Sequence, residues 1–135
     1  DNPIPFTGKI FGLGHTLRNF KIEKNETALF DDSLTSLYGV GLFAMFSGEI
    51  YDLTLEKVKV SGNNFVGGLI GIMNDGVVEN CHIINNDFND INASGYIVSK
   101  DDVFVGGVVG KVFGGKVTGV TYNKTNKNIV GEIKW

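Results

Sequence analysis

The chain has 135 residues, of which 42% are hydrophobic and 20% are charged, and its formal net charge is −3. This length and balance predict one globular domain, residues 1–135, with a buried core. The lysines and arginines are scattered, which excludes the basic surface of a nucleic-acid-binding protein. No apolar run approaches the about 20 residues that a membrane-spanning helix needs, so we expect no membrane insertion. The single cysteine, Cys81, excludes an intrachain disulfide, and we expect the chain to be a fragment of a larger protein.

A glycine-rich pattern recurs along the chain at a period of a few tens of residues, which is typical of stacked repeats. Each copy has a quartet that opens on glycine, then a further glycine seven or eight residues later, and then a short apolar segment. The quartets are residues 41–44, 68–71 and 107–110, with Gly41, Gly68 and Gly107 at the first position and Gly71 and Gly110 at the last.

In chain order, the first coil of the repeat is expected over residues 6–22, with residues 4–6 covering the open N-terminal end of the stack. Its glycine is Gly14 and its apolar positions are Leu17, Phe20 and Ile22, with one extra residue after the glycine. Residues 23–37 follow as a loop or a short helical excursion.

Three further coils follow, over residues 38–64, from residue 65, and over residues 103–128. Residues 129–135 are expected to open a fifth coil or to close the stack. The inward positions of these coils are Ile50, Leu53 and Leu55, then Val78, Cys81 and Ile83, then Val117, Val120 and Tyr122. We therefore predict that one interior file contains Phe20, Leu53, Cys81 and Val120.

The position before the second apolar residue of each copy favours a bend. It holds Asn19, Asp52, Asn80 and Gly119, residue types that tolerate left-handed backbone. Short apolar segments rich in Val, Ile and Phe, about three strands per coil, and corners at fixed positions predict an all-β fold, a parallel β-helix of about four coils. A β-sandwich is the alternative, but it requires alternation without identical columns.

An insertion interrupts the third copy. The interval from the quartet at Gly68 to the quartet at Gly107 is longer than the interval from Gly41 to Gly68. The extra residues fall within residues 85–102, and in a solenoid such an insertion is expected to form a surface loop. This loop is rich in Asn and Asp, so a calcium site is one hypothesis; its carboxylates are Asp87, Asp90, Asp101 and Asp102. Solvated turn residues are the simpler interpretation.

Residues 6–20 resemble the opening coil of bacterial surface proteins with the GLUG repeat, whose pattern is Phe-x-Gly followed by Asn-Gly-His-x-Ile-x-Asn-Leu. Leu13 stands here where Asn is common, and the three quartets resemble the GLUG element, with Ala44 and Val108 as departures. These repeats occur in adhesins and in the N-terminal regions of immunoglobulin-A-cleaving metallopeptidases. The resemblance implies a right-handed β-helix that is exported and non-catalytic.

The residues that carry chemistry do not form a recognised motif. His15 and His82 are far apart in the sequence and no HExxH zinc motif is present, so a zinc site of a metallopeptidase parent would lie outside this chain. His15 is expected at a corner and His82 on the outer surface, and Cys81 is expected to be a small buried apolar residue. We expect no cofactor. Glu49 and Glu79 are expected as an outward acidic pair on neighbouring coils.

Two functions remain open from the sequence. The first is a non-catalytic module of a bacterial cell-surface or secreted protein, acting as a spacer, an adhesive face or a docking surface. Its partners would be a host protein or glycan surface, or other domains of the same parent chain. The second is a carbohydrate-binding or polysaccharide-degrading β-helix. A structural piece that assembles with other copies is a third possibility.

Overall fold

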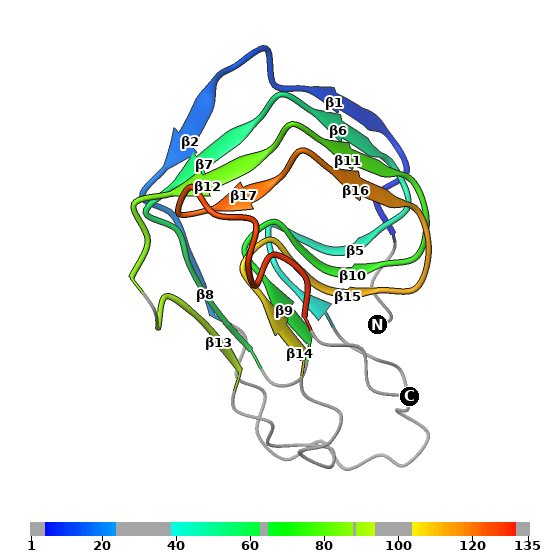
Figure 1. Ribbon diagram of the computed structural model, residues 1–135. Coiled ribbons are helices and arrows are strands. Elements are labelled where there is room, and N and C mark those ends of the chain that lie inside the picture. Colours follow the sequence, from blue (N-terminus) through cyan, green and yellow to red (C-terminus); the bar gives the residue numbers. More distant parts are fainter. Residues whose placement is uncertain (1–4, 24–38, 63–64, 88, 94–103, 132–135) are drawn as a thin grey trace, which may run out of the picture.

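The computed structural model describes residues 5–23, 39–62, 65–87, 89–93 and 104–131, and these residues form a parallel β-helix (Figure 1). The regular elements of this described part are all strands. Strands that occupy the same place in successive coils lie side by side and run parallel. The all-β solenoid predicted from the repeat is therefore confirmed. Most of the excursion predicted over residues 23–37 and most of the tail lie outside the described residues.

The strands are short, two to four residues each. In chain order they are β1 (Lys9–Phe11), β2 (Thr16–Arg18), β3 (Lys21–Glu23), β4 (Gly39–Val40), β5 (Phe43–Phe46), β6 (Glu49–Tyr51), β7 (Thr54–Glu56), β8 (Lys59–Gly62), β9 (Phe65–Gly67), β10 (Ile70–Met73), β11 (Val77–Glu79), β12 (His82–Ile84), β13 (Ile91–Ala93), β14 (Phe104–Gly106), β15 (Val109–Val112), β16 (Lys116–Thr118) and β17 (Thr121–Tyr122).

Among the described residues, five parallel sheets run along the stack. Two have four strands, in the orders β1-β6-β11-β16 and β17-β12-β7-β2, and three have three strands, in the orders β15-β10-β5, β13-β8-β3 and β14-β9-β4. The prediction of about three strands per coil was wrong, because glycines and left-handed residues divide each coil at more corners than the apolar columns revealed.

The interior of the stack is built from files of like residues. Ile50 lies between Ile10 and Val78 in the register of the first sheet, and both Ile50 and Val78 are buried. The buried residues Leu53, Cys81 and Val120 lie together in the next file. The Leu53 carbonyl accepts a hydrogen bond from the His82 N–H at 3.0 Å, and the Cys81 carbonyl accepts one from Thr121 at 3.1 Å.

Phe20 does not belong to that file, so its predicted place was wrong. Its carbonyl accepts a hydrogen bond from the Lys59 N–H at 3.0 Å, and Lys21 pairs with Lys59, which sets Phe20 beside Val58. The first copy of the repeat begins at Gly8, because Lys9 pairs with Glu49.

The first coil is out of step because its first corner is longer. Residues 12–15 separate Phe11 from Thr16, whereas residues 52–53 separate the paired Tyr51 from Thr54. The repeat in the sequence was aligned on Gly14, which matched Leu17 with Ile50. In the structure the copy begins at Gly8, so Leu17 lies beside Leu55 instead.

Left-handed backbone at non-glycine residues recurs at two of the corners of the coil, and the Asn, Asp and Gly column predicted one of them. The first corner contains Asp52 (φ 59°), Asn80 (φ 53°) and Gly119 (φ 61°), and the second contains Asn19 (φ 64°), Lys57 (φ 53°) and Asn85 (φ 58°). Asn19 therefore lies at the second corner, beside Lys57, one corner further along the coil than the repeat predicted. An asparagine tolerates this conformation better than most residues because its short side chain bonds locally.

The quartet glycines allow successive coils to approach closely. Gly41, Gly68 and Gly107 lie over one another, since Ile70 pairs with both Phe43 and Val109. A Cβ atom on Gly68 would lie 2.5 Å from the Gly107 carbonyl oxygen, and one on Gly71 would collide with the Val40 nitrogen. Gly110 is equally closed, since its Cβ would lie 2.5 Å from the Gly71 carbonyl oxygen.

Part of the predicted surface loop belongs to the solenoid instead. Within residues 85–102, Ile91 is buried and pairs with Val60, so β13 adds a strand to the sheet of β3 and β8. The side chain of Asn86 is buried as well. Residues 88 and 94–102 lie outside the described residues.

Phe6 occupies the start of the first coil. It forms a parallel bridge with Phe46, and their rings stack with centroids 5.7 Å apart. The ring of Phe43 also packs on Phe6, with centroids 4.8 Å apart. The aromatic cluster covers the end of β5.

Candidate functional site

The outer surface of the sheet β1-β6-β11-β16 carries two rows of side chains. One row contains Lys9, Glu49, Val77 and Lys116, and the other contains Phe11, Tyr51, Glu79 and Thr118. Glu49 and Glu79 thus lie on neighbouring coils, as expected, but in different rows. Glu49 pairs with Val77, and Glu79 pairs with Tyr51.

Glu49 is held by its neighbours on the same face. The Tyr51 hydroxyl donates a hydrogen bond to Glu49 Oε1, and Lys9 Nζ lies 3.5 Å from Glu49 Oε2. The hydrogen bond from Tyr51 is the main reason that the pKa of Glu49 is lowered, with Lys9 adding to the effect. A carboxyl group with a lowered pKa is ionised at neutral pH and does not suit the role of a general acid. This face resembles a set of structural ties more than a catalytic pair.

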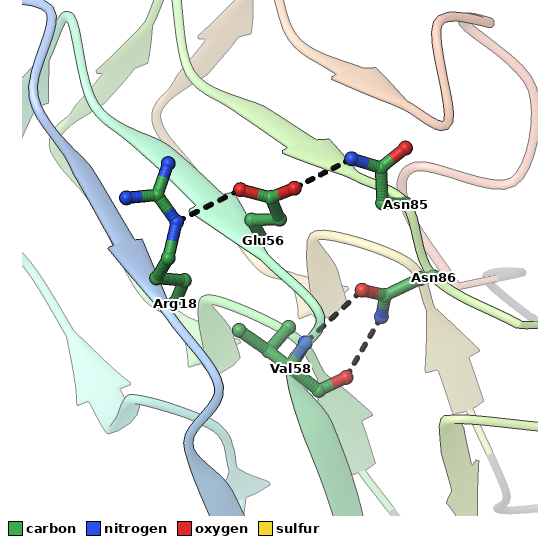
Figure 2. Close-up of polar contacts among 5 residues, drawn as sticks. All are labelled: Arg18, Glu56, Val58, Asn85 and Asn86. Atoms are coloured by element: carbon green, nitrogen blue, oxygen red, sulfur yellow. Dashed lines mark hydrogen bonds and ion pairs between the residues drawn. The ribbon is translucent and has the colours of Figure 1, made fainter.

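The neighbouring sheet carries a polar chain across three coils. Figure 2 shows Glu56 between Arg18 of the preceding coil and Asn85 of the following one. Arg18 Nε lies 2.9 Å from Glu56 Oε1, and Asn85 Nδ2 donates to Glu56 Oε2 at 2.6 Å. The hydrogen bond from Asn85, followed by that from Arg18, lowers the pKa of Glu56.

A second polar chain follows the first corner. Asn80 Nδ2 donates to Asp52 Oδ1 at 2.7 Å, and Asn80 Oδ1 lies 2.9 Å from His82 Nε2. The other ring nitrogen of His82 lies 2.7 Å from the Thr121 hydroxyl. His82 is therefore on the outer side, as predicted, but it also links two coils. The side chain of His15 is exposed at the corner of the first coil. Its backbone N–H donates a hydrogen bond to the Gly12 carbonyl at 2.9 Å.

Asn86 provides a polar tie inside the stack. Its Oδ1 accepts from the Val58 N–H at 3.0 Å and its Nδ2 donates to the Val58 carbonyl at 2.8 Å (Figure 2). Asn123 repeats this arrangement one coil further, because its Oδ1 and Nδ2 bond the N–H and carbonyl of Asn86 at 2.9 and 2.7 Å. Each asparagine thus satisfies both backbone groups of the residue in the coil before it.

The role of these asparagines was not predicted from the sequence. Val58 precedes Asn86 at the same place in the register, since Glu56 pairs with Ile84. The signal in the sequence is that Asn86 stands where the previous copy has the apolar Val58. Such an exchange indicates a buried position whose side chain forms hydrogen bonds.

Cys81 lies in the buried file and matches the expectation of a small apolar residue. Its Sγ lies 3.9 Å from the Ile50 carbonyl oxygen and 3.5 Å from that of Glu79. Burial raises the pKa of the Cys81 thiol, so the reactive thiolate is disfavoured at neutral pH.

The proposed calcium residues are only partly described. The Asp87 N–H donates to Asp90 Oδ2 at 2.7 Å, so the Asp90 carboxylate already closes a turn. Within the described residues no group of three or more His, Cys, Asp or Glu side chains is arranged to hold a metal ion. Asp101 and Asp102 lie outside these residues, and the calcium hypothesis remains a prediction.

A shallow polar concavity lies on the outer side of the sheet β3-β8-β13. Its volume is about 250 Å³, and it is lined by Lys21, Ile22, Glu23, Lys59, Val60, Ser61, Asn89, Asp90 and Asn92. Lys21 pairs with Lys59 across the two strands, and Lys21 Nζ lies 2.9 Å from Glu23 Oε1. The lining therefore combines donors and acceptors, with both signs of charge.

Comparison with known proteins finds similarity to halomucin from Haloquadratum walsbyi (strain DSM 16790 / HBSQ001), with 32% identity over 114 residues. The match covers 83% of this chain and 1% of halomucin, so the chain spans only a small part of the relative that it matches. No family model matches the chain, and no solved structure matches it significantly.

The described part of the chain contains no helix that is long and apolar enough to cross a membrane.

Proposed function

We propose that this chain is a non-catalytic β-helical section of a cell-surface or secreted protein, acting as a spacer or docking surface. The observation that carries this proposal is the register. Ile10, Ile50, Val78 and Val117 follow one another across four parallel strands, so the repeat builds a continuous rod rather than an enclosed site.

The polar groups on the outside support the same role. Glu49, Glu56 and His82 each bond side chains of another strand or coil. Side chains that are engaged in such ties stiffen the stack, and they are less available for proton transfer to a substrate.

The similarity to halomucin supports a location at the cell surface. The resemblance of the quartets to the GLUG repeat agrees with this location and extends the proposal to adhesins and to docking regions of exported peptidases. A bacterial source and a host protein or glycan partner belong to the same proposal.

The location is tested on intact cells of the organism that makes the protein. An antibody raised against the purified chain should label unpermeabilised cells or the medium, and external protease should remove the cellular signal. A cytoplasmic protein serves as the control for cell integrity. Labelling that requires permeabilisation would rule out the proposed location.

Carbohydrate binding is a second candidate, and the polar concavity on the sheet β3-β8-β13 favours it. Sugar hydroxyls both donate and accept hydrogen bonds, which suits a lining that contains Lys59, Ser61 and Asn92. Its volume of about 250 Å³ lies just below the about 300–1,000 Å³ of typical small-molecule sites, so it suits a single sugar unit rather than a longer chain.

Binding of oligosaccharides from a glycan array tests this second candidate. Lys59→Ala and Asn92→Ala should both weaken any binding that is found, whereas Lys116→Ala, on another sheet, should not. Absence of binding at millimolar oligosaccharide would dismiss it.

A further inference from the structure

Within the part of the chain that the structure describes, the N-terminal end of the stack leaves part of its inward file exposed. Leu17 lies in the inward file, beside Leu55, and Leu55 lies beside Ile83. The exposed fractions are 45% for Leu17 but 1% for both Leu55 and Ile83. An inward side chain of the first coil thus meets solvent where a preceding coil would cover it.

The C-terminal end of the stack is better covered. Val120 is buried, and the backbone groups of Tyr122 and Thr125 bond each other at 2.9 and 3.2 Å. The Asn128 carbonyl accepts from the Gly107 N–H at 2.6 Å, and Val130 forms a parallel bridge with Val109. Residues 128–131 therefore begin to lie over the fourth coil, where the red segment in Figure 1 ends near β14.

Three strands of the first coil are sheet edges. β1, β2 and β3 each stand at the end of a sheet order, so one backbone edge of each strand has no strand partner among the described residues. Natural proteins normally protect such edges with charged or covering groups. The edge strands carry Lys9, Arg18 and Lys21, but β1 also exposes Phe11 to 61% and the corner after it exposes Leu13 to 75%.

Phe11 shows the direction in which the stack would continue. Its ring stacks on that of Tyr51 with centroids 5.5 Å apart and planes 11° apart. One face of Phe11 is covered in this way, and the exposure of the side chain shows that the opposite face is open. A ring or apolar side chain from one coil further would continue this ladder.

We infer that the outer edge of β1 and β2, together with Phe11, Leu13 and Leu17, is a stacking surface for a further parallel coil of the same repeat type. Such a coil continues the ladder that already joins β1 to β6 and places an apolar side chain over Leu17. The inference rests on the architecture alone and does not depend on the proposed cellular location.

A second copy of the chain fits this surface less well. Stacked head to tail, it would bring Lys116 of one copy into the row of Lys9 of the other, and like charges directly opposite are unfavourable. Residues 128–131 would also lie between the two copies. The partner is therefore a coil whose C-terminal edge is open.

The register defines a direct experiment. Met73 pairs with Phe46, so residues 46–72 complete one turn of the β-helix, and Phe6 bridges Phe46 at the same place in the first coil. A copy of residues 46–72 inserted between Pro5 and Phe6 should add one coil, which sets a second Tyr51 side chain on Phe11. Hydrogen exchange of the amides in β1 and β2 should slow by about tenfold or more, because they are no longer at the end of the stack.

Two controls accompany the extended chain. An insertion of the same length and composition in scrambled order should leave the exchange of β1 and β2 unchanged. Phe11→Asp in the extended chain should abolish most of the protection, whereas Phe11→Asp in the original chain, where the side chain is exposed, should have little effect. The inference would be overturned if the inserted coil stayed unfolded or destabilised the chain. Equal protection of β1 by the scrambled insertion would overturn it too. Sedimentation should give the same oligomeric state for the original chain, the extended chain and the control variants.

Discussion

The side-chain amide of Asn86 bonds both backbone groups of Val58, at 3.0 Å to its N–H and 2.8 Å to its carbonyl. This pair joins the third coil to the second at a place inside the stack where neither backbone group meets water. At the corner between β7 and β8, these two hydrogen bonds take the place of backbone hydrogen bonds between neighbouring strands.

The first prediction concerns this pair. Asn86→Ala leaves the N–H and carbonyl of Val58 buried without these partners, and each such group is expected to cost about 1–3 kcal/mol. We expect the free energy of unfolding to fall by about 2–4 kcal/mol in urea denaturation. Asn89→Ala, at an exposed position three residues on, is the matched control and should change it by less than about 0.5 kcal/mol. Equal effects of the two variants would show that the tie contributes nothing specific.

The second prediction separates close packing from backbone strain at glycine. Gly71→Ala sets a Cβ within 2.5 Å of Gly39 Cα and should destabilise the fold by about 3 kcal/mol or more, because only backbone atoms surround it. Gly14→Ala has no atom within 4 Å but a φ of +77°, so only strain of about 1 kcal/mol applies. Thermal unfolding of both variants measures the difference, and a milder effect at Gly71 than at Gly14 would contradict the close approach of the coils.

The third prediction is a stabilising change. The Tyr122 hydroxyl is buried and has no hydrogen-bond partner within the described residues, and burial raises its pKa more than the nearby Asn86 side chain lowers it. Tyr122→Phe removes this polar atom and keeps the ring, so we expect a gain of up to about 1 kcal/mol. Tyr51→Phe, which removes the hydrogen bond to Glu49, should give no gain. A loss of stability in Tyr122→Phe would show that the hydroxyl is bonded.

The fourth prediction concerns pH. The pKa of Glu56 is lowered from its ordinary value of 4.5, mainly by Asn85 and then by Arg18. Because the folded-state pKa lies below the unfolded one, the ionised group stabilises the fold above about pH 4.5, and this contribution is lost as the pH falls through the folded-state pKa. Glu56→Gln should therefore unfold at lower urea concentration than the parent at pH 7, and this difference should shrink as the pH falls below about 4.5 and through the lowered folded-state pKa.

The control for this pH effect is Glu79→Gln, because Glu79 is exposed and has no ion pair among the described residues. Its difference from the parent should stay small across the same pH range. A constant difference between Glu56→Gln and the parent, independent of pH, would contradict the role of the charge. Added salt should weaken the part that comes from Arg18.

The repeat made most of the stack predictable. Identical spacing after Gly48, Gly76 and Gly115 sets Ile50, Val78 and Val117 in one file, and the structure pairs them in that order. The corner residues followed because Asn, Asp and Gly are the types that adopt left-handed backbone.

The first coil was misplaced because two glycines compete as its start. Gly8 lies two residues before Ile10, just as Gly48 lies two residues before Ile50. A copy that starts at Gly8 therefore needs no extra residue between the glycine and the first apolar position. The longer corner at residues 12–15 supplies Gly14 as a second candidate, and the repeat was aligned on it with one extra residue. Register is set by the hydrophobic pattern and by the geometry of the connecting turns, so a corner of variable length conceals it in the sequence.

The polar ties were not predictable from the columns. Glu56, Asn85 and Arg18 come from three coils whose outward positions vary freely in residue type. The buried Asn86 and the exposed Asn123 lie in or beside segments that the sequence predicts as surface loop, since Asn favours turns. Only the register reveals which backbone groups their amides reach.

The central claim is that successive coils lie in parallel register around one interior file. Nuclear magnetic resonance couplings across hydrogen bonds test it on the isotope-labelled chain. The account predicts couplings from the His82 amide nitrogen to the Leu53 carbonyl carbon and from that of Thr121 to that of Cys81, since these bonds are 3.0 and 3.1 Å long. Reciprocal couplings between sequence neighbours, as in the hairpins of a β-sandwich, with neither of these two present, would contradict it.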